Sequence, residues 1–221
     1  MRMLPSHIAF VFFLSLWFNS YSYSQPPKPA SHTTRCIEGW IVHIDDRLLT
    51  GDDKQLGEHA LRILANRLYD IAMVVPESKL AKLRRVPIWL DRTHGKLAPA
   101  QYHPSAAWLE DNGYAKELAK CVHIPDAKYF ADARHQREQP WATLHELAHA
   151  YTHVGRDIGG DTWEESAFAK SDLEVKEGLA QFYTAVVVRK LSQRAPGAVE
   201  AYDALLKYQS EPYRVHLEWL K

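Results

Sequence analysis

The segment Trp141–Gly155, with the sequence WATLHELAHAYTHVG, constrains the fold of this chain more than any other part of it. It holds three histidines at four-residue intervals, and a glutamate follows the first of them. The flanking residues are uncharged, which indicates a buried helix, and unpaired imidazoles in a buried helix would be costly. We therefore expect an interior helix whose histidines share a partner.

The spacing of the first two histidines suits a metal ion. On a helix, His145 and His149 lie one turn apart and ~40° apart around the axis, so two ring nitrogens can reach one tetrahedral zinc ion at ~2.0–2.1 Å. Glu146 is rotated by ~100° from His145 and lies beside the metal without binding it. In this H-E-x-x-H arrangement the metal lowers the pKa of a water and the glutamate acts as general base. The sequence thus predicts a Zn²⁺ site with Glu146 as the catalytic residue.

The third histidine does not complete this site. Ligands at His145, His149 and His153 would span ~12 Å at ~1.5 Å rise per residue, and bonds of ~2 Å cannot bridge that length. The longer pattern H-E-x-x-H-x-x-G-x-x-H also fails, because Thr152 stands at its glycine position and Gly155 at its last histidine position. The third ligand must come from another part of the chain.

The downstream segment SDLEVKEGLAQFYT offers three carboxylates on or near a second helix. We expect Glu177 to be the third ligand, because Gly178 and Ala180 beside it allow two helices to approach closely. Glu174 is the second choice, either as a ligand or as an acceptor for the other N–H of a ligand histidine. Asp172 is the third choice.

HELAH together with EGLAQ resembles the motifs of the zincin metallopeptidases, in their glutamate-ligand (gluzincin) branch. More loosely, VPIWLD, AQYHPSAAWLEDNGYAKELAKCVHIP and PWATLHELAHAY are similar to uncharacterised exported bacterial proteins with zincin domains, over roughly Trp40–Tyr183. The resemblance implies that His145, His149 and Glu177 bind the metal and that Glu146 is the base. It also implies that the strand before the active-site helix, Cys121–Pro125 here, is a sheet edge that receives extended substrate.

The resemblance further implies a downstream tyrosine or histidine that stabilises the oxyanion. The sequence does not choose among its candidates, each of which could instead be a packed core residue: Tyr183, Tyr202, Tyr213 and His216. Three residues before Cys121 could line the cleft or belong to an ordinary loop: His94, Tyr102 and His103.

The N-terminus is typical of an exported protein. Arg2 precedes the apolar run Ile8–Phe18, which is shorter than the ~20 residues that a spanning helix needs. We interpret residues 1–24 as a signal peptide cleaved near Ser22 or Ser24, with an uncleaved anchor as the alternative. A proline-rich linker is expected over residues 25–35, and the protein is expected to be secreted or periplasmic, with no membrane span after cleavage.

Residues 36–221 are expected to form one zincin-like α+β domain, with a small twisted sheet, a backing helix, the active-site helix and a mostly helical C-terminal part. Hydrophobic patterns predict a strand within residues 36–49, a helix over 54–75, and short strands within 85–92 and 121–124. The segment between these two short strands is expected to be a structured excursion with a helical turn. Helices are predicted over 173–191 and within 198–220.

An exported zinc peptidase acting on peptides or proteins is the function that these features favour. A zincin-fold binding or cell-envelope interaction module is the alternative, and hydrolysis of another kind of bond stays open. Lys+Arg and Asp+Glu are both 27, so no global charge favours nucleic acid as a partner. Cys36 and Cys121 could form one disulfide or remain separate thiols.

Overall fold

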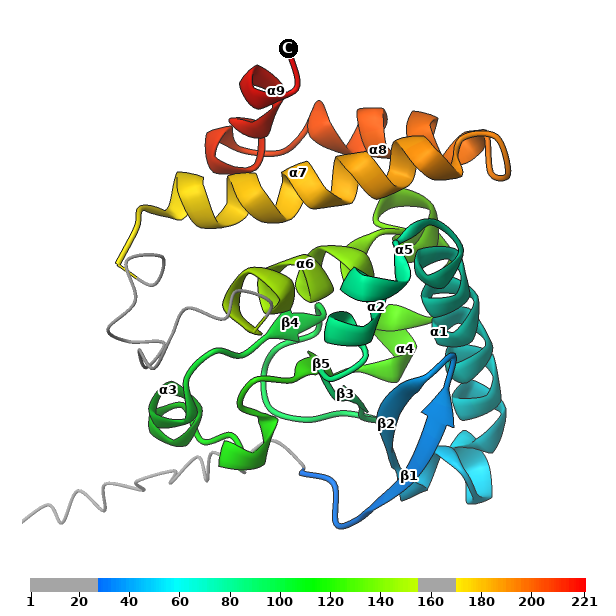
Figure 1. The fold of residues 1–221 in the computed structure, drawn as a ribbon. Helices are drawn as coiled ribbons and strands as arrows, with labels where there is room; N and C mark the ends of the chain where they lie inside the picture. The colour runs from blue at the N-terminus through cyan, green and yellow to red at the C-terminus, as the bar shows by residue number, and fades with distance from the viewer. Residues whose placement is uncertain (1–27, 155–169) are drawn as a thin grey trace, which may run out of the picture.

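The computed structural model describes residues 28–154 and 170–221, and these form an α+β fold (Figure 1). A five-stranded mixed sheet has the order β1-β2-β3-β5-β4. Its strands are β1 (His32–Ile37), β2 (Trp40–Asp45), β3 (Ile88–Leu90), β4 (Gln101–Tyr102) and β5 (Val122–Ile124). The predicted α+β class is confirmed. The predicted signal peptide and its cleavage site lie outside the described residues.

The first two strands form a hairpin where the sequence had predicted a single strand. Glu38 and Gly39 both have positive φ, 51° and 90°, as a two-residue hairpin turn of type I′ requires. Because β1 already begins at His32, residues 32–35 are strand and not the predicted linker.

One face of the sheet forms the main core. The three central strands β2, β3 and β5 run parallel, and alternate residues of each are buried on this face: Val42, Ile44, Ile88, Leu90, Val122 and Ile124. Helix α1 (Lys54–Val74) follows β2 after the short turns η1 (Asp46–Leu48) and η2 (Gly51–Asp53), and buries Leu64, Leu68 and Ile71 in the same cluster. This helix and β3 confirm the elements predicted there, whereas α2 (Glu77–Leu83) was not predicted.

The segment between β3 and β5 contains its own small core. It includes α3 (Ala106–Asp111) and η3 (Lys116–Leu118), and it buries Leu109, Tyr114 and Leu118 with Trp89 packed against them. The predicted excursion with a helical turn is therefore found. Strand β4 within it was not predicted.

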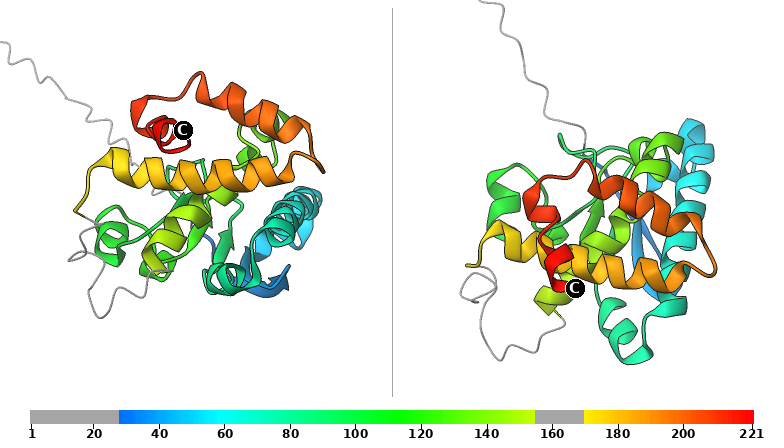
Figure 2. Two further views of the ribbon diagram at one scale, coloured as in Figure 1. Left: turned by 45° about the horizontal axis from the view of Figure 1, so that its top comes forward. Right: turned by 90° about the horizontal axis from the view of Figure 1, so that it is seen from above.

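The C-terminal part is helical, as predicted. Two short helices, α4 (Ala127–Phe130) and α5 (Ala133–Glu138), begin at capping residues Asp126 and Asp132 and precede α6 (Ala142–Val154). Helix α7 (Leu173–Leu191) lies across α6, and α8 (Gly197–Leu206) runs back along α7 (Figures 1 and 2). The chain ends with η5 (Glu211–Tyr213) and α9 (His216–Trp219) packed on α7. Within the two described ranges, no helix combines the length and the apolar character needed to cross a membrane.

Candidate metal centre

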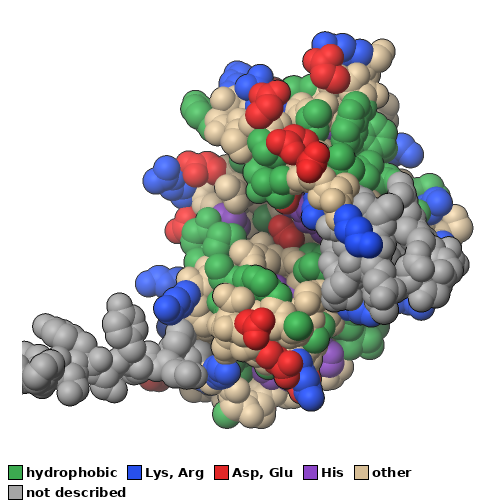
Figure 3. Space-filling model, turned by 90° about the vertical axis from the view of Figure 1, so that its left-hand side faces the viewer, with side chains coloured by type: hydrophobic (Ala, Val, Ile, Leu, Met, Phe, Trp, Pro, Cys, Tyr) green, Lys and Arg blue, Asp and Glu red, His purple; other side chains and the backbone are tan. Residues whose placement is uncertain are grey.

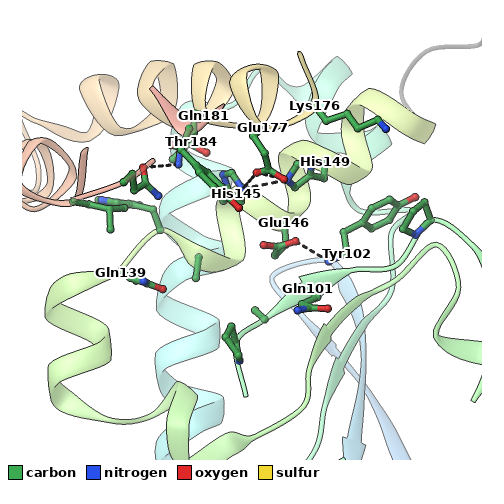
Figure 4. A pocket seen from close by; sticks show the side chains of 18 residues that line it. Gln101, Tyr102, Gln139, His145, Glu146, His149, Lys176, Glu177, Gln181 and Thr184 are labelled. Atoms are coloured by element: carbon green, nitrogen blue, oxygen red, sulfur yellow. Dashed lines mark hydrogen bonds and ion pairs between the residues drawn. The ribbon is translucent and has the colours of Figure 1, made fainter. Parts of the chain in front are cut away.

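Three potential metal ligands meet where α6 and α7 cross (Figure 4). Nε2 of His145 lies 3.1 Å from Nε2 of His149 and 3.1 Å from Oε2 of Glu177, and His149 Nε2 lies 3.3 Å from the same oxygen. Ligands of a tetrahedral ion with bonds of ~2.0–2.1 Å are roughly 3.3–3.4 Å apart. The three atoms thus form a nearly equilateral triangle of a size that one metal ion could bridge.

The packing of α6 against α7 brings the side chains of His145, His149 and Glu177 together. Leu147 and Ala150 of α6 are completely buried in the main core, while His145 and His149 face α7 and keep 14% and 17% of their side chains exposed. On α7, Glu177 is partly buried against them. Glu174 and Asp172, the second and third choices from the sequence, are exposed instead. The structure therefore brings Glu177 to the two histidines.

The environment of the triangle keeps its carboxylate ionised. Burial acts to raise the pKa of Glu177, but hydrogen bonds from His145 and His149 outweigh this and lower it to about 2. Burial acts to lower the pKa of His149, yet its hydrogen bond to Glu177 and the charges of Glu146 and Glu177 raise it overall. Two imidazoles and an ionised carboxylate are a donor set that suits a divalent ion such as zinc.

Glu146 lies beside the triangle, one residue after His145 on α6. Its Oε2 accepts a 2.7 Å hydrogen bond from the backbone N–H of Tyr102 in β4 (Figure 4). Burial raises the pKa of Glu146, against the opposing effect of His145 and His149. A carboxylate with a raised pKa is a better proton acceptor than an exposed one. Its position and its environment therefore suit a general base.

The sheet edge nearest this site is β4, and the prediction that Cys121–Pro125 forms the edge was wrong. Strand β5 pairs with β3 on one side and with β4 on the other, so it is internal. The His103 N–H donates to Cys121 O, toward β5, whereas the neighbouring Tyr102 N–H points the opposite way, to Glu146. The outward edge of β4 thus faces α6.

A cavity of about 580 Å³ opens over the triangle, between β4 on one side and, on the other, α7 with the C-terminal turn (residues 207–215, between α8 and α9). Figure 3 shows a hollow with acidic and histidine side chains at its bottom and hydrophobic side chains above and below. Four amide side chains and one cation line the cavity with the site residues, and the sequence did not single them out: Gln101, Gln139, Gln181, Gln209 and Lys176. Gln181 ends the EGLAQ segment, but no motif marks the other four, because the five side chains come from four separate segments of the chain.

Tyr213 is the one oxyanion candidate from the sequence that lines this cavity. Its ring centroid lies 6.1 Å from that of His145. Burial raises the pKa of Tyr213, and the charges of Glu177 and Glu146 raise it further, so its hydroxyl retains its proton. A protonated phenol at this position can donate a hydrogen bond into the cavity.

The other candidates have structural roles. The Tyr202 hydroxyl lies within donating distance of the backbone O and Oε1 of Gln181 and is also hydrogen-bonded to Nε2 of His216, and both Tyr202 and His216 are buried. Tyr183 packs its ring against Tyr151, with centroids 5.5 Å apart, and does not line the cavity.

Gly178 has a different role from the one predicted. A Cβ at this position would lie 2.5 Å from Val215 Cγ1 and 2.7 Å from Trp219 Cη2, so the glycine faces the C-terminal turn and α9 instead of α6. It allows the segment that carries Tyr213 to pack directly on α7. Close approach of α6 and α7 is therefore not what this glycine provides.

Of the three candidates in the excursion, only Tyr102 reaches the cleft. His94 and His103 are buried beside His123 instead. The His153 side chain lies outside the described part of the chain. Cys36 is exposed, Cys121 is buried, and both are free thiols, so the disulfide alternative is not found.

No family model matches this chain, and no significant match is found among curated proteins or solved structures.

Proposed function

We propose that this chain is an exported zinc metallopeptidase of the gluzincin type, with His145, His149 and Glu177 as ligands and Glu146 as general base. The observation that carries the proposal is the triangle of ligand atoms 3.1–3.3 Å apart, with the partly buried carboxylate of Glu146 beside it in the lining of a cavity. The order of these residues, HELAH followed by EGLAQ, supports the same function.

A zinc ion held by these residues would act as a Lewis acid that polarises a substrate carbonyl and lowers the pKa of water. Glu146 would accept the proton of the attacking water at its carboxylate and pass it to the nitrogen of the leaving amine. The Tyr102 N–H holds that carboxylate in place through Oε2. The proton acceptor therefore has a fixed position relative to the cleft.

Strand β4 would position the substrate. Its outward edge lies next to Glu146, so an extended peptide added along this edge passes over the ligand triangle. Tyr213, on the opposite wall, would donate its hydroxyl proton in a hydrogen bond to the carbonyl oxygen as negative charge develops there. The polar amides around the cavity suit a peptide backbone better than an apolar ligand.

Turnover of a mixed peptide library by the zinc-loaded protein tests this function. We expect cleavage that stops after treatment with a chelator and returns when Zn²⁺ is added back. A protein that binds zinc and peptides and yet releases no cleavage products would contradict the proposal and favour the binding module. Cleavage that persists in a fully zinc-free sample would also contradict it.

A further inference from the structure

A second group of potential metal ligands lies away from the cleft, on the other side of the sheet. Asp91 directly follows β3, His94 follows it by three residues, and His123 belongs to β5, where it faces away from the main core. Each offers one ligand atom, and these atoms all lie within 4.8 Å of one another. In the described part of the chain, only this trio and the cleft triad meet that condition.

One carboxylate oxygen joins this group. Oδ2 of Asp91 lies 2.8 Å from Nδ1 of His94 and 2.9 Å from Nε2 of His123. The other oxygen, Oδ1, lies 2.7 Å from Nε2 of His32, at the start of β1. Three imidazoles from three separate segments therefore point at a single carboxylate.

The burial of this carboxylate calls for a compensating charge. The side chains of Asp91 and His123 are completely buried, and that of His94 is 5% exposed. The three imidazoles are hydrogen-bonded to Asp91, and the guanidinium of Arg47 is bonded to Asp45. A buried carboxylate needs a partner of opposite charge, and a divalent cation among the three ligand atoms would supply it.

Surrounding contacts hold the ligand side chains in place. Nδ1 of His123 faces Nε2 of His103 at 3.4 Å, and His32 holds the second oxygen of Asp91. Such outer contacts fix the ring and the carboxylate orientation in metal sites.

The loop that carries His94 is also fixed. The backbone N–H groups of Lys96 and Leu97 donate to the Tyr114 hydroxyl at 3.1 and 3.3 Å. Gly95 has a φ of 72° and packs directly on the Tyr114 ring, which leaves no room for a side chain.

We propose that Asp91, His94 and His123 bind a second divalent cation of the zinc class, which acts as a structural ion. Mixed imidazole and carboxylate donors suit zinc among the common divalent metals. The group is buried and does not line the cleft, so an ion there has no access to substrate. It would connect β3, β5 and the loop after β3, and thereby support the part of the sheet that carries β4. This site does not depend on the proposed peptidase function.

Zinc content in a variant without the cleft ligands tests the second site alone. The double variant H145A/H149A is equilibrated with Zn²⁺, freed of excess metal by gel filtration and analysed by atomic emission. We expect about one zinc per chain in this variant and about two in the unmodified chain. Adding H94Q should remove the remaining zinc.

H43Q in the same background is the matched control. His43 lies on the same side of the sheet and contacts Trp89, with ring centroids 4.4 Å apart, but its Nδ1 is bonded to Thr34. This control should keep the zinc. A folded H145A/H149A chain without zinc would overturn the proposal, and so would equal zinc content in the H94Q and H43Q variants.

A spectroscopic readout covers the case in which H94Q fails to fold. Zinc-edge X-ray absorption of the H145A/H149A variant should show scattering from two imidazole rings. A shell of oxygen alone would contradict the site. Because the cleft ligands are absent from this variant, neither result depends on whether the protein is a peptidase.

Discussion

The backbone N–H of Tyr102 donates a 2.7 Å hydrogen bond to Oε2 of Glu146, and this contact joins the edge strand β4 to the helix α6. The donor is part of the strand that would align a substrate, and the acceptor is the proposed general base. A movement of β4 would therefore move the base as well. In the proposed mechanism, this backbone group would couple the position of the substrate to proton transfer.

The role of Glu177 as third ligand can be tested against that of its neighbour Glu174. Glu177→Ala removes the carboxylate that lies 3.1 Å from His145 Nε2. We expect zinc affinity to fall by more than the ~10–100-fold that an outer-shell partner contributes. Glu174→Ala, the matched control, removes an exposed carboxylate of the same helix and should leave zinc affinity unchanged. Competition with a chelating dye measures both, and equal effects would argue against Glu177 as the ligand.

The hydroxyl of Tyr213 is expected to act only during turnover. Tyr213→Phe keeps the ring that packs near His145 and removes the hydrogen-bond donor. Loss of one oxyanion donor lowers kcat by about 10²–10³-fold, with zinc content unchanged. Tyr208→Phe is the control, since Tyr208 is 89% exposed and does not line the cavity. An unchanged kcat in Y213F would exclude this tyrosine as the oxyanion donor.

Gly178 should be sensitive to the smallest added side chain. The Cβ of Gly178→Ala would lie 2.5 Å from Val215 Cγ1 and 2.7 Å from Trp219 Cη2, so Val215 and Trp219, next to the turn that carries Tyr213, must shift. We expect a loss of about 1–3 kcal/mol in the free energy of unfolding, together with lower activity.

Gly197→Ala is the matched control for this prediction. Its Cβ would have no atom within 4 Å, and Gly197 begins α8, so this change should not destabilise the protein. Urea unfolding monitored by tryptophan fluorescence compares the two variants. Equal stability of G178A and the unmodified chain would show that the C-terminal turn tolerates displacement.

Much of the site follows from local geometry, and this is why the sequence predicts it. The positions of His145, Glu146 and His149 on one helix are fixed by helical rise and rotation. The prediction of Glu177 needed one further inference, namely that the third ligand is a carboxylate on a second helix that packs on the first. The predicted grouping of His145, His149 and Glu177 is found in the structure, while their binding of zinc stays a prediction.

The features that the sequence did not predict, or predicted wrongly, depend on how strands pair in the folded structure. Strand β4 has only two residues, too few to give a periodic pattern, and it takes the edge that had been assigned to Cys121–Pro125. By sequence, His94 and His103 could line the cleft or belong to an ordinary loop, but pairing of β5 with β3 and with β4 brings them to His123 on the other side of the sheet. The hairpin turn at Glu38–Gly39 was missed because Glu is not a typical residue at a positive φ.

The central claim is that Glu146 accepts and delivers the proton during hydrolysis, next to a zinc ion held by other residues. Glu146→Gln keeps the side-chain size and can still accept the hydrogen bond from the Tyr102 N–H, but it cannot take up a proton. Turnover of the same peptides by the unmodified and E146Q proteins, at equal measured zinc content, tests this most directly. We predict full zinc binding and a fall in kcat of at least about 10²–10⁴-fold in E146Q. An E146Q protein that cleaves at the rate of the unmodified chain would contradict the mechanism.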